Sequence, residues 1–242
     1  MRAGPLGDRL ADWAVAAGLD PALLPPPAAL APLAACEPCR PPADPKHVEA
    51  WERRHGFRLP RELRAWLLTS DGFYRDGPLI HPLSAIGPMI PFARVPDLVV
   101  QPESWFELGN PGAETVCIDL AYDWPGGSCP IFTSGDDLRE SPPRIIAPGF
   151  ADWFLRLLHA GCREFWLEGG DFSLGDPWCE HRRRTPVPPL SDRLRPLAPR
   201  VLPLMHPGAD DRAIATELGI SRCDLEAIFR HLQHAPGQFE GS

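Results

Sequence analysis

Residues 47–74 read HVEAWERRHGFRLPRELRAWLLTSDGFY, and this is the most informative stretch of the chain. Val48 and Trp51 lie three positions apart, so they share one apolar stripe of a short helix. Gly56 follows at the position where a left-handed C-cap forms most easily. Pro60 then favours a new helix start, because its fixed φ angle suits the first helical turn.

The second helix of this stretch carries its own apolar stripe. Leu63, Trp66 and Leu67 recur at helical spacing and are expected to face a core. Asp71 and Gly72 end the helix with residues that are typical of turns. The pattern therefore predicts two short helices joined by a tight connection, which is a scaffold and not an active site.

This block resembles the SMI1/KNR4 superfamily, also called SUKH. The family pattern has an aromatic-Glu pair, a glycine, a Leu-Pro pair and a small-polar-Gly turn, which here are Trp51-Glu52, Gly56, Leu59-Pro60 and Ser70-Asp71-Gly72. The resemblance continues to about residue 160 and covers roughly half of the chain. Its later segments look like the strands and the closing helix of the family, at 105–108, 115–120, 130–133, 145–147 and 150–154.

The resemblance implies an α+β fold. We expect a mostly antiparallel sheet packed with helices, to which a small C-terminal three-helix unit is added. Four parts are predicted: 1–45 as an N-terminal helix and a Pro/Ala-rich linker, 46–161 as the SMI1/KNR4-like domain, 162–189 as an irregular connector, and 190–242 as a helical tail. Leu6–Ala17 has the spacing of an amphipathic helix, whereas 20–45 is rich in Pro and Ala and is predicted to be extended.

The tail resembles the helix-turn-helix of LuxR-type regulators. The matching residues are Val201-Leu202, Leu204-Met205, Gly208, Arg212–Ala215 and Leu218–Ser221. Gly219 is expected to make the turn and Ser221 to cap the next helix. Leu225, Ile228, Phe229 and Leu232 are expected to bury that helix.

The residues of the tail that would contact DNA differ from those of LuxR-type regulators. LuxR-type recognition helices carry Thr-Val-Lys where this chain has Asp224-Leu225-Glu226. A phosphate contact needs Lys or Arg, and a carboxylate is repelled there. The tail is therefore interpreted as a packing unit, and nucleic acid is not the expected partner. A working DNA reader stays open as the alternative.

Four Cys and His residues allow a metal or redox hypothesis. Cys36 and Cys39 form a C-x2-C pair, and Cys179 and His181 could complete a zinc site with four N/S ligands. A redox pair would need a thioredoxin-like helix start, but the flanks look like a linker. The remaining interpretation is a set of ordinary reduced thiols. The chain has seven Cys, an odd number, which favours reduced thiols and a cytoplasmic location.

No catalytic set emerges from the sequence. The chain contains none of the H-E-x-x-H, G-x-S-x-G or P-loop motifs. The carboxylate pairs Asp136-Asp137 and Asp210-Asp211 are typical of turns and caps, because adjacent residues on a strand point to opposite faces. We therefore expect no enzyme activity, no cofactor and no resident metal. No apolar run reaches the ~18 residues of a membrane helix, so no membrane association is expected.

The charge pattern is the clearest functional signal. The chain carries a net charge of −8, and no basic residue occurs between Arg94 and Arg139. The acids of that stretch are Asp97, Glu103, Glu107, Glu114, Asp119, Asp123, Asp136 and Asp137. They can form a solvated surface that needs no partner, or a surface that steers a basic partner.

Aromatic residues lie among these acids and suggest anchors for a partner, although they fit core positions equally well. The candidate partner-binding residues are Asp97, Glu103, Trp105, Glu107, Asp119, Asp123 and Trp124. The family is known for bacterial toxin-immunity proteins and for fungal scaffolds of cell-wall signalling. The resemblance thus implies a non-catalytic protein-interaction module, with a basic toxin domain as one class of partner. The alternative is a DNA-binding regulator in which the SMI1/KNR4-like domain is the sensor; the oligomeric state is not indicated.

Overall fold

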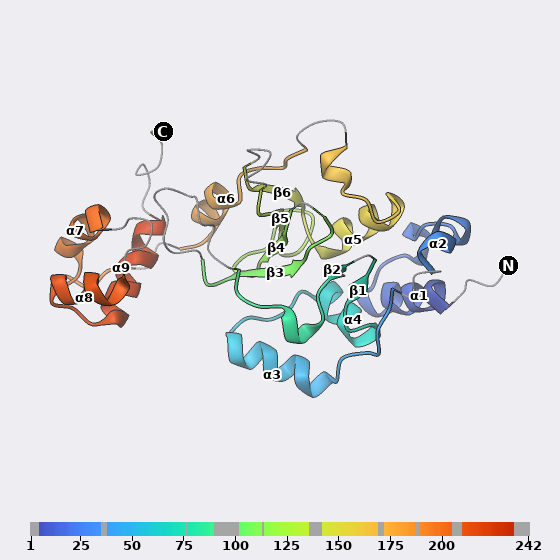
Figure 1. The fold of residues 1–242 in the computed structure, drawn as a ribbon, viewed down its shortest axis with the longest axis horizontal. Coiled ribbons are helices and arrows are strands. Elements are labelled where there is room, and N and C mark those ends of the chain that lie inside the picture. The colour runs from blue at the N-terminus through green and yellow to red at the C-terminus, as the bar shows by residue number, and fades with distance from the viewer. Residues whose placement is uncertain are drawn as a thin grey trace. The chain divides into compact units, whose positions relative to one another are not determined.

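The computed structural model describes residues 5–34, 38–75, 77–89, 102–112, 114–135, 142–168, 172–186, 189–204 and 210–234. The chain forms two compact units, Met1–Pro88 with Ser104–Pro177, and Met89–Glu103 with Trp178–Ser242. Figure 1 lets the reader follow both along the chain by colour. The predicted α+β class is confirmed, since the described residues contain a four-stranded antiparallel sheet, helices, and a helical C-terminal region.

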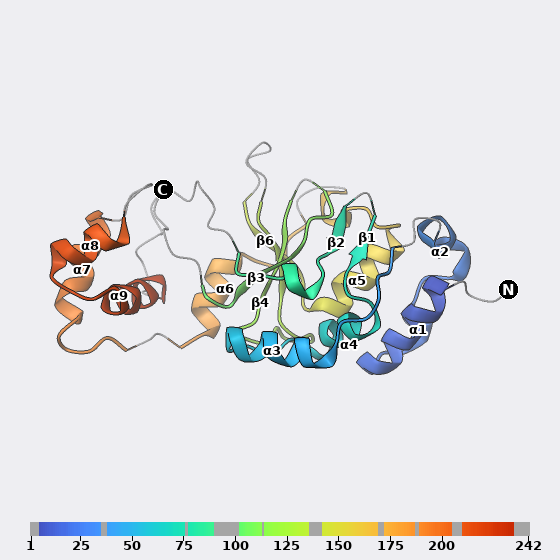
Figure 2. The same cartoon turned by 60° about the horizontal axis from the view of Figure 1, so that its bottom comes forward.

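The first unit contains the helices α1 (Pro5–Ala17), α2 (Pro27–Ala34), α3 (Pro45–His55), α4 (Arg61–Thr69) and α5 (Phe150–His159). Its strands are β1 (Phe73–Tyr74), β2 (Pro78–Ile80), β3 (Trp105–Gly109), β4 (Val116–Asp119), β5 (Ile131–Thr133) and β6 (Arg144–Ala147). Buried residues of α1, α4 and α5 join one core with one face of the sheet. Figure 2 shows α1 next to α4.

The two helices predicted from residues 47–74 are present as α3 and α4. Gly56 ends α3 in the left-handed region at φ 75°, and its N–H donates to the Glu52 carbonyl. The Glu52 side chain then accepts a hydrogen bond from the Leu59 N–H at 3.0 Å, which fixes the connection before Pro60. Trp51 is buried, and its indole N–H donates to the Ile86 carbonyl at 2.9 Å. Gly56 and Glu52 of the sequence pattern thus fix the connection between α3 and α4.

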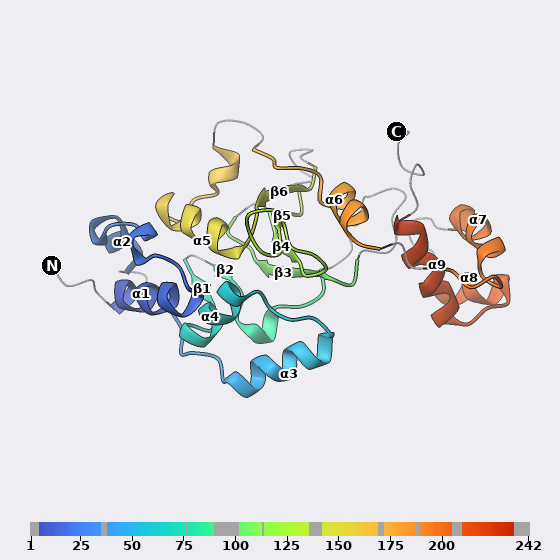
Figure 3. The same ribbon diagram turned by 180° about the vertical axis from the view of Figure 1, so that it is seen from behind.

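The main sheet has the order β3-β4-β5-β6, which can be traced in Figure 3. Cys117 of β4 pairs with Phe132 of β5, and both are buried on the face turned away from the helix-covered core. The sheet is therefore covered on both faces. Further backbone hydrogen bonds continue the sheet at its two edges, from the His81 N–H to the Leu108 carbonyl and from the Ile145 N–H to the Gly175 carbonyl.

Aromatic rings fill the centre of the first unit. Trp66 of α4 lies 4.7 Å from Phe154 of α5 and 6.0 Å from Trp13 of α1, measured between ring centroids. Both contacts are edge-to-face, an arrangement that aromatic pairs favour. Trp66 is completely buried, as its place in the helical stripe predicts.

The extended linker predicted for residues 20–45 is wrong for the part that the structure describes. Residues 27–34 form α2, whose Leu30 and Leu33 are buried in the same core as α1. The prolines mislead here because several of them begin helical turns: Pro21 starts a 3-10 turn, Pro27 starts α2, and Pro45 starts α3. A division at residue 45 therefore does not separate two cores.

The stretch 162–189, predicted as an irregular connector, also contains helical structure. A 3-10 turn spans Phe165–Leu167, and α6 spans Pro177–Arg184. Glu180 of α6 accepts from Arg183 at 2.6 Å and from Arg184 at 2.8 Å. These i,i+3 and i,i+4 pairs stabilise α6. The Pro and Gly residues around it led to the prediction of irregular structure.

The second unit includes α7 (Ala198–Val201), α8 (Asp211–Leu218) and α9 (Arg222–His234) around a core of its own. Gly219 ends α8 at φ 66°, and the Ser221 hydroxyl accepts the Asp224 N–H at 3.1 Å at the start of α9. Leu225, Ile228, Phe229 and Leu232 are buried in that core. The predicted turn, cap and buried stripe of the tail are all confirmed.

Candidate partner-binding surface

The β4–β5 loop presents the most exposed of the predicted acids in the first unit. The loop closes through two backbone bonds, from the Trp124 N–H to the Ser128 carbonyl at 2.8 Å and from the Gly127 N–H to the Trp124 carbonyl at 3.0 Å. A Cβ at Gly127 would lie 2.3 Å from the Pro148 carbonyl oxygen, so the loop packs closely there. Asp123 is exposed and Trp124 is half-buried. A fixed loop therefore holds an acid and an aromatic side by side.

Trp105 and Asp119, which the sequence places among the partner-binding candidates, lie inside the protein instead. They are opposite each other in the β3–β4 register, and both are buried. The Asp119 carboxylate accepts from the Trp105 indole at 2.8 Å, from the Ser104 hydroxyl at 2.7 Å and from the Ala121 N–H at 2.9 Å. The structure thus gives this pair the role of anchoring the start of the β4–β5 loop.

The other predicted acids belong to different parts of the described structure. Glu107 lies on β3 and is only partly exposed. Glu103 belongs to the second unit, where it is exposed and lies 3.4 Å from Arg230. Asp97 lies outside the described residues, as do Asp136 and Asp137.

Glu114 belongs to the stretch without basic residues, but in the fold an arginine from outside that stretch pairs with it. Its carboxylate is buried and pairs at 3.0 Å with Arg144, which comes from β6. It also accepts the Trp166 indole N–H at 2.9 Å. This acid therefore contributes to the interior, because a base distant in sequence neutralises it.

Sequence reasoning missed one acid near the β4–β5 loop. Burial, followed in order of size by the negative charges of Asp123, Asp119 and Glu62, raises the pKa of the Cys129 thiol to about 12. Glu62 comes from the first turn of α4, and its Oε2 atom is buried without a hydrogen-bond partner among the described residues. No local pattern connects Glu62 with this loop, since only the tertiary fold brings the two together.

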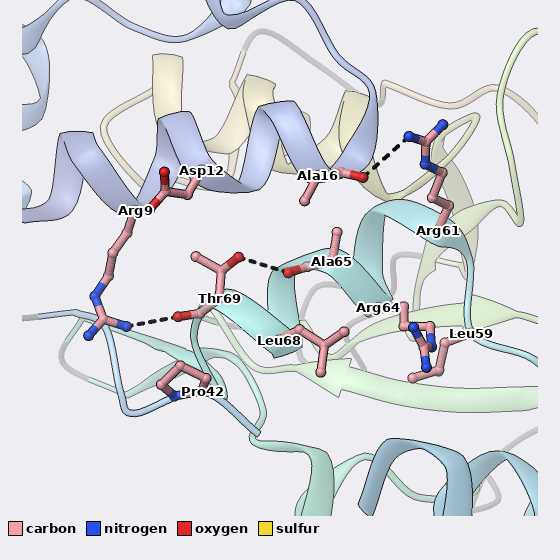
Figure 4. Close-up of a pocket in the computed structure, with 10 residues that line it drawn as sticks. All are labelled: Arg9, Asp12, Ala16, Pro42, Leu59, Arg61, Arg64, Ala65, Leu68 and Thr69. Atoms are coloured by element: carbon pink, nitrogen blue, oxygen red, sulfur yellow. Dashed lines mark hydrogen bonds between the residues drawn. The ribbon is translucent and has the colours of Figure 1, made fainter. Parts of the chain in front are cut away.

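A groove of about 900 Å³ lies between α1 and α4 (Figure 4). Arg9 stands at one end and Arg61 at the other, with Ala65 and Leu68 between them. The Arg9 Nη1 atom donates to the Thr69 carbonyl at 2.8 Å, and the Arg61 Nη2 atom donates to the Ala16 carbonyl at 3.3 Å. Each arginine therefore reaches the C-terminal end of the opposite helix, where a positive charge is favoured.

The cysteines and histidines raised as a metal hypothesis are not brought together in the described residues. Cys36 lies outside them, and Cys39 is half-buried beside Phe73, with a pKa raised chiefly by burial. Cys179 is exposed, whereas His181 is buried. Within the described ranges, no group of three or more His, Cys, Asp or Glu side chains is placed to hold a metal ion.

Comparison with protein families identifies the central region. Residues 42–156 match the model of the SMI1 / KNR4 family (SUKH-1). The chain carries a SUKH-1 domain. The match begins just before α3 and ends within α5, so α1 and α2 lie outside it although they share the core of this domain. A comparison with curated proteins finds no match.

The match also ends before the helical tail at residues 190–242. The resemblance of residues 190–242 to LuxR-type regulators therefore stays a prediction. Among the helices of the described residues, none has both the length and the apolarity needed to cross a membrane.

Proposed function

We propose that this protein is a non-catalytic protein-interaction module of the immunity type, which binds a basic protein partner such as a toxin domain. The SUKH-1 match over residues 42–156 is the observation that carries this proposal. The family typically consists of non-catalytic immunity proteins, so a protein partner is the expected ligand. The acidity of the chain, with a net charge of −8, favours a partner of opposite charge.

The proposed binding surface is the β4–β5 loop with the start of α4. Asp123 is exposed on the loop, and its charge and that of Glu62 both act on the Cys129 thiol at the end of the loop. Trp124 is half-buried, so part of its large side chain is open to a partner. Ordered aromatic residues beside charges are typical of interface hot spots. Trp105 and Asp119 are buried, so they hold the start of the loop through hydrogen bonds and do not contact a partner.

A growth assay tests the function. The chain is co-expressed in a bacterial host with the C-terminal domain of each toxin whose gene is found beside its own, and growth is compared with the toxin domain alone. Rescue of growth together with a complex on size exclusion supports the proposal. A toxin domain that stays active and elutes separately contradicts it.

Association kinetics with that toxin domain test the surface. Asp123→Lys and Glu62→Lys should slow association and weaken its dependence on salt, because long-range attraction acts mainly on the rate of encounter. Asp8→Lys is the matched control, since Asp8 is an exposed acid on α1. If Asp123→Lys and Glu62→Lys associate as fast as Asp8→Lys, these two acids serve solubility alone.

One observation favours the DNA-binding alternative. α8 and α9 pack together and are joined by a tight turn at Gly219, which is the arrangement of a helix-turn-helix. Asp224, however, bonds to Ser221 and lies 2.5 Å from Arg193, and Glu226 is exposed on α9. Binding of the full chain to pooled duplex fragments at two salt concentrations tests this alternative. Submicromolar binding with a steep salt dependence would favour it.

A further inference from the structure

We propose that the groove between α1 and α4 is a second binding site, which takes a short, extended, acidic segment of a protein. The segment would carry an apolar residue between its carboxylates. This inference goes beyond the proposed function, because it concerns a different surface and a partner of the opposite charge.

The groove concentrates positive charge on an acidic chain. Arg9, Arg61 and Arg64 line it, and Asp12 is the acid among its lining residues. The local balance is therefore positive, although the chain as a whole carries −8. The acidic surface elsewhere on the protein repels an acidic ligand, whereas the arginines of the groove attract it. An acidic ligand would therefore be directed to the groove.

The arginine head groups are held in place before any ligand arrives. Arg9 uses Nη1 to bond the carbonyls of Arg40 and Thr69 at 2.9 and 2.8 Å, and Arg61 bonds the Ala16 carbonyl. A guanidinium group has five N–H donors, so both retain donors for a carboxylate. Less side-chain freedom is lost on binding when the head group is already oriented.

The middle of the groove is apolar. Ala65 and Leu68 of α4 form its floor between the arginines, and Pro42 and Leu59 border it (Figure 4). The nine residues of α4 span about 14 Å at 1.5 Å per residue, which corresponds to roughly four residues of extended chain. An extended segment with acidic ends and an apolar centre therefore matches both the length and the chemistry of the groove.

A second groove of about 720 Å³ continues the basic surface. It shares Leu59 and Arg64 with the first groove and adds Arg53 and Arg58 from α3 and the α3–α4 connection. Glu49 and Glu52 also line it, and each lies 3.9 Å from an arginine. A longer acidic segment could thus continue past Arg64, which favours a protein chain over a compact small molecule as the ligand.

Peptide binding to the full-length protein tests the proposal. The probes are fluorescein-labelled peptides of sequence EELEE, KKLKK and EEGEE, followed by fluorescence anisotropy. EELEE should bind, KKLKK should not, and EEGEE should bind more weakly because it lacks the apolar centre. Arg64→Gln, Arg61→Gln and Leu68→Ser should each weaken EELEE binding by about tenfold, as expected for the loss of one charge-assisted or apolar contact.

Arg163→Gln is the matched control, because Arg163 is an exposed arginine of the same unit that does not line the groove. Within the described ranges, the Arg64 side chain pairs with Glu52 at 3.9 Å and bonds no helix-end carbonyl, so its variant is expected to keep the fold, which circular dichroism verifies. The proposal is overturned if EELEE does not bind at millimolar concentration, if Arg64→Gln and Arg163→Gln bind it equally, or if a labelled tetranucleotide binds more tightly. None of these three results bears on the β4–β5 loop, because Asp123 of that loop does not line the groove.

Discussion

At the residue scale, the acids of one stretch have different roles according to what folding brings to them. Asp119 and Glu114 are buried and fully engaged, by the Trp105 indole in one case and by Arg144 in the other. Asp123 lies only a few positions after Asp119 and is exposed. Burial and partners, not position in the acid-rich stretch, therefore decide which acids can meet another protein.

Asp119→Ala should lower the free energy of unfolding by roughly 2–4 kcal/mol, because it leaves the Trp105, Ser104 and Ala121 donors without their acceptor. Asp123→Ala is the matched control and should change stability by less than about 0.5 kcal/mol, as an exposed substitution usually does. Urea unfolding followed by tryptophan fluorescence measures both. Equal stability of the two variants would show that the Asp119 hydrogen bonds do not support the loop.

At the element scale, local patterns predict what local physics controls. The α3–Gly56–α4 connection and the Gly219–Ser221 turn follow from φ preference, proline geometry and capping, all of which are visible in a few neighbouring residues. The packing of α2 and the burial of Trp105 could not be predicted, since both depend on partners far away in the chain. Glu62 beside the β4–β5 loop belongs to the same class.

Gly56→Ala should cost about 1 kcal/mol of stability, and Gly56→Val about 1–3 kcal/mol. No atom lies within 4 Å of a Cβ built at Gly56, so the cost comes from the φ angle of 75° and not from a clash. Gly77→Ala is the control, because Gly77 is equally open and has no positive φ. A chemical melt in which both alanine variants match the parent would contradict the left-handed cap as the source of the stability.

At the scale of the whole molecule, two cores form from one chain. The first gathers α1 to α5 and the sheet, and the second gathers α7 to α9. All tryptophans except Trp178 lie in the first unit, so tryptophan fluorescence reports mainly on that unit. The helical signal in circular dichroism reports on both.

Ile228→Ala removes a completely buried side chain from the second core and should cost it roughly 2–5 kcal/mol. The helical transition should then begin at lower denaturant, while the fluorescence midpoint stays unchanged. Ile146→Ala in the first core should shift the fluorescence midpoint instead. If Ile228→Ala moves both signals together, the two cores unfold as one cooperative body.

The backbone bonds that close the β4–β5 loop have an evolutionary consequence. They use only main-chain atoms of Trp124, Gly127 and Ser128, and the tight approach to Pro148 depends on a glycine. The exposed positions at Asp123 and Pro125 can therefore change identity while the loop keeps its course. Under the proposed function, substitutions at these two positions would change the target that the loop recognises and would leave the backbone bonds of the loop unchanged.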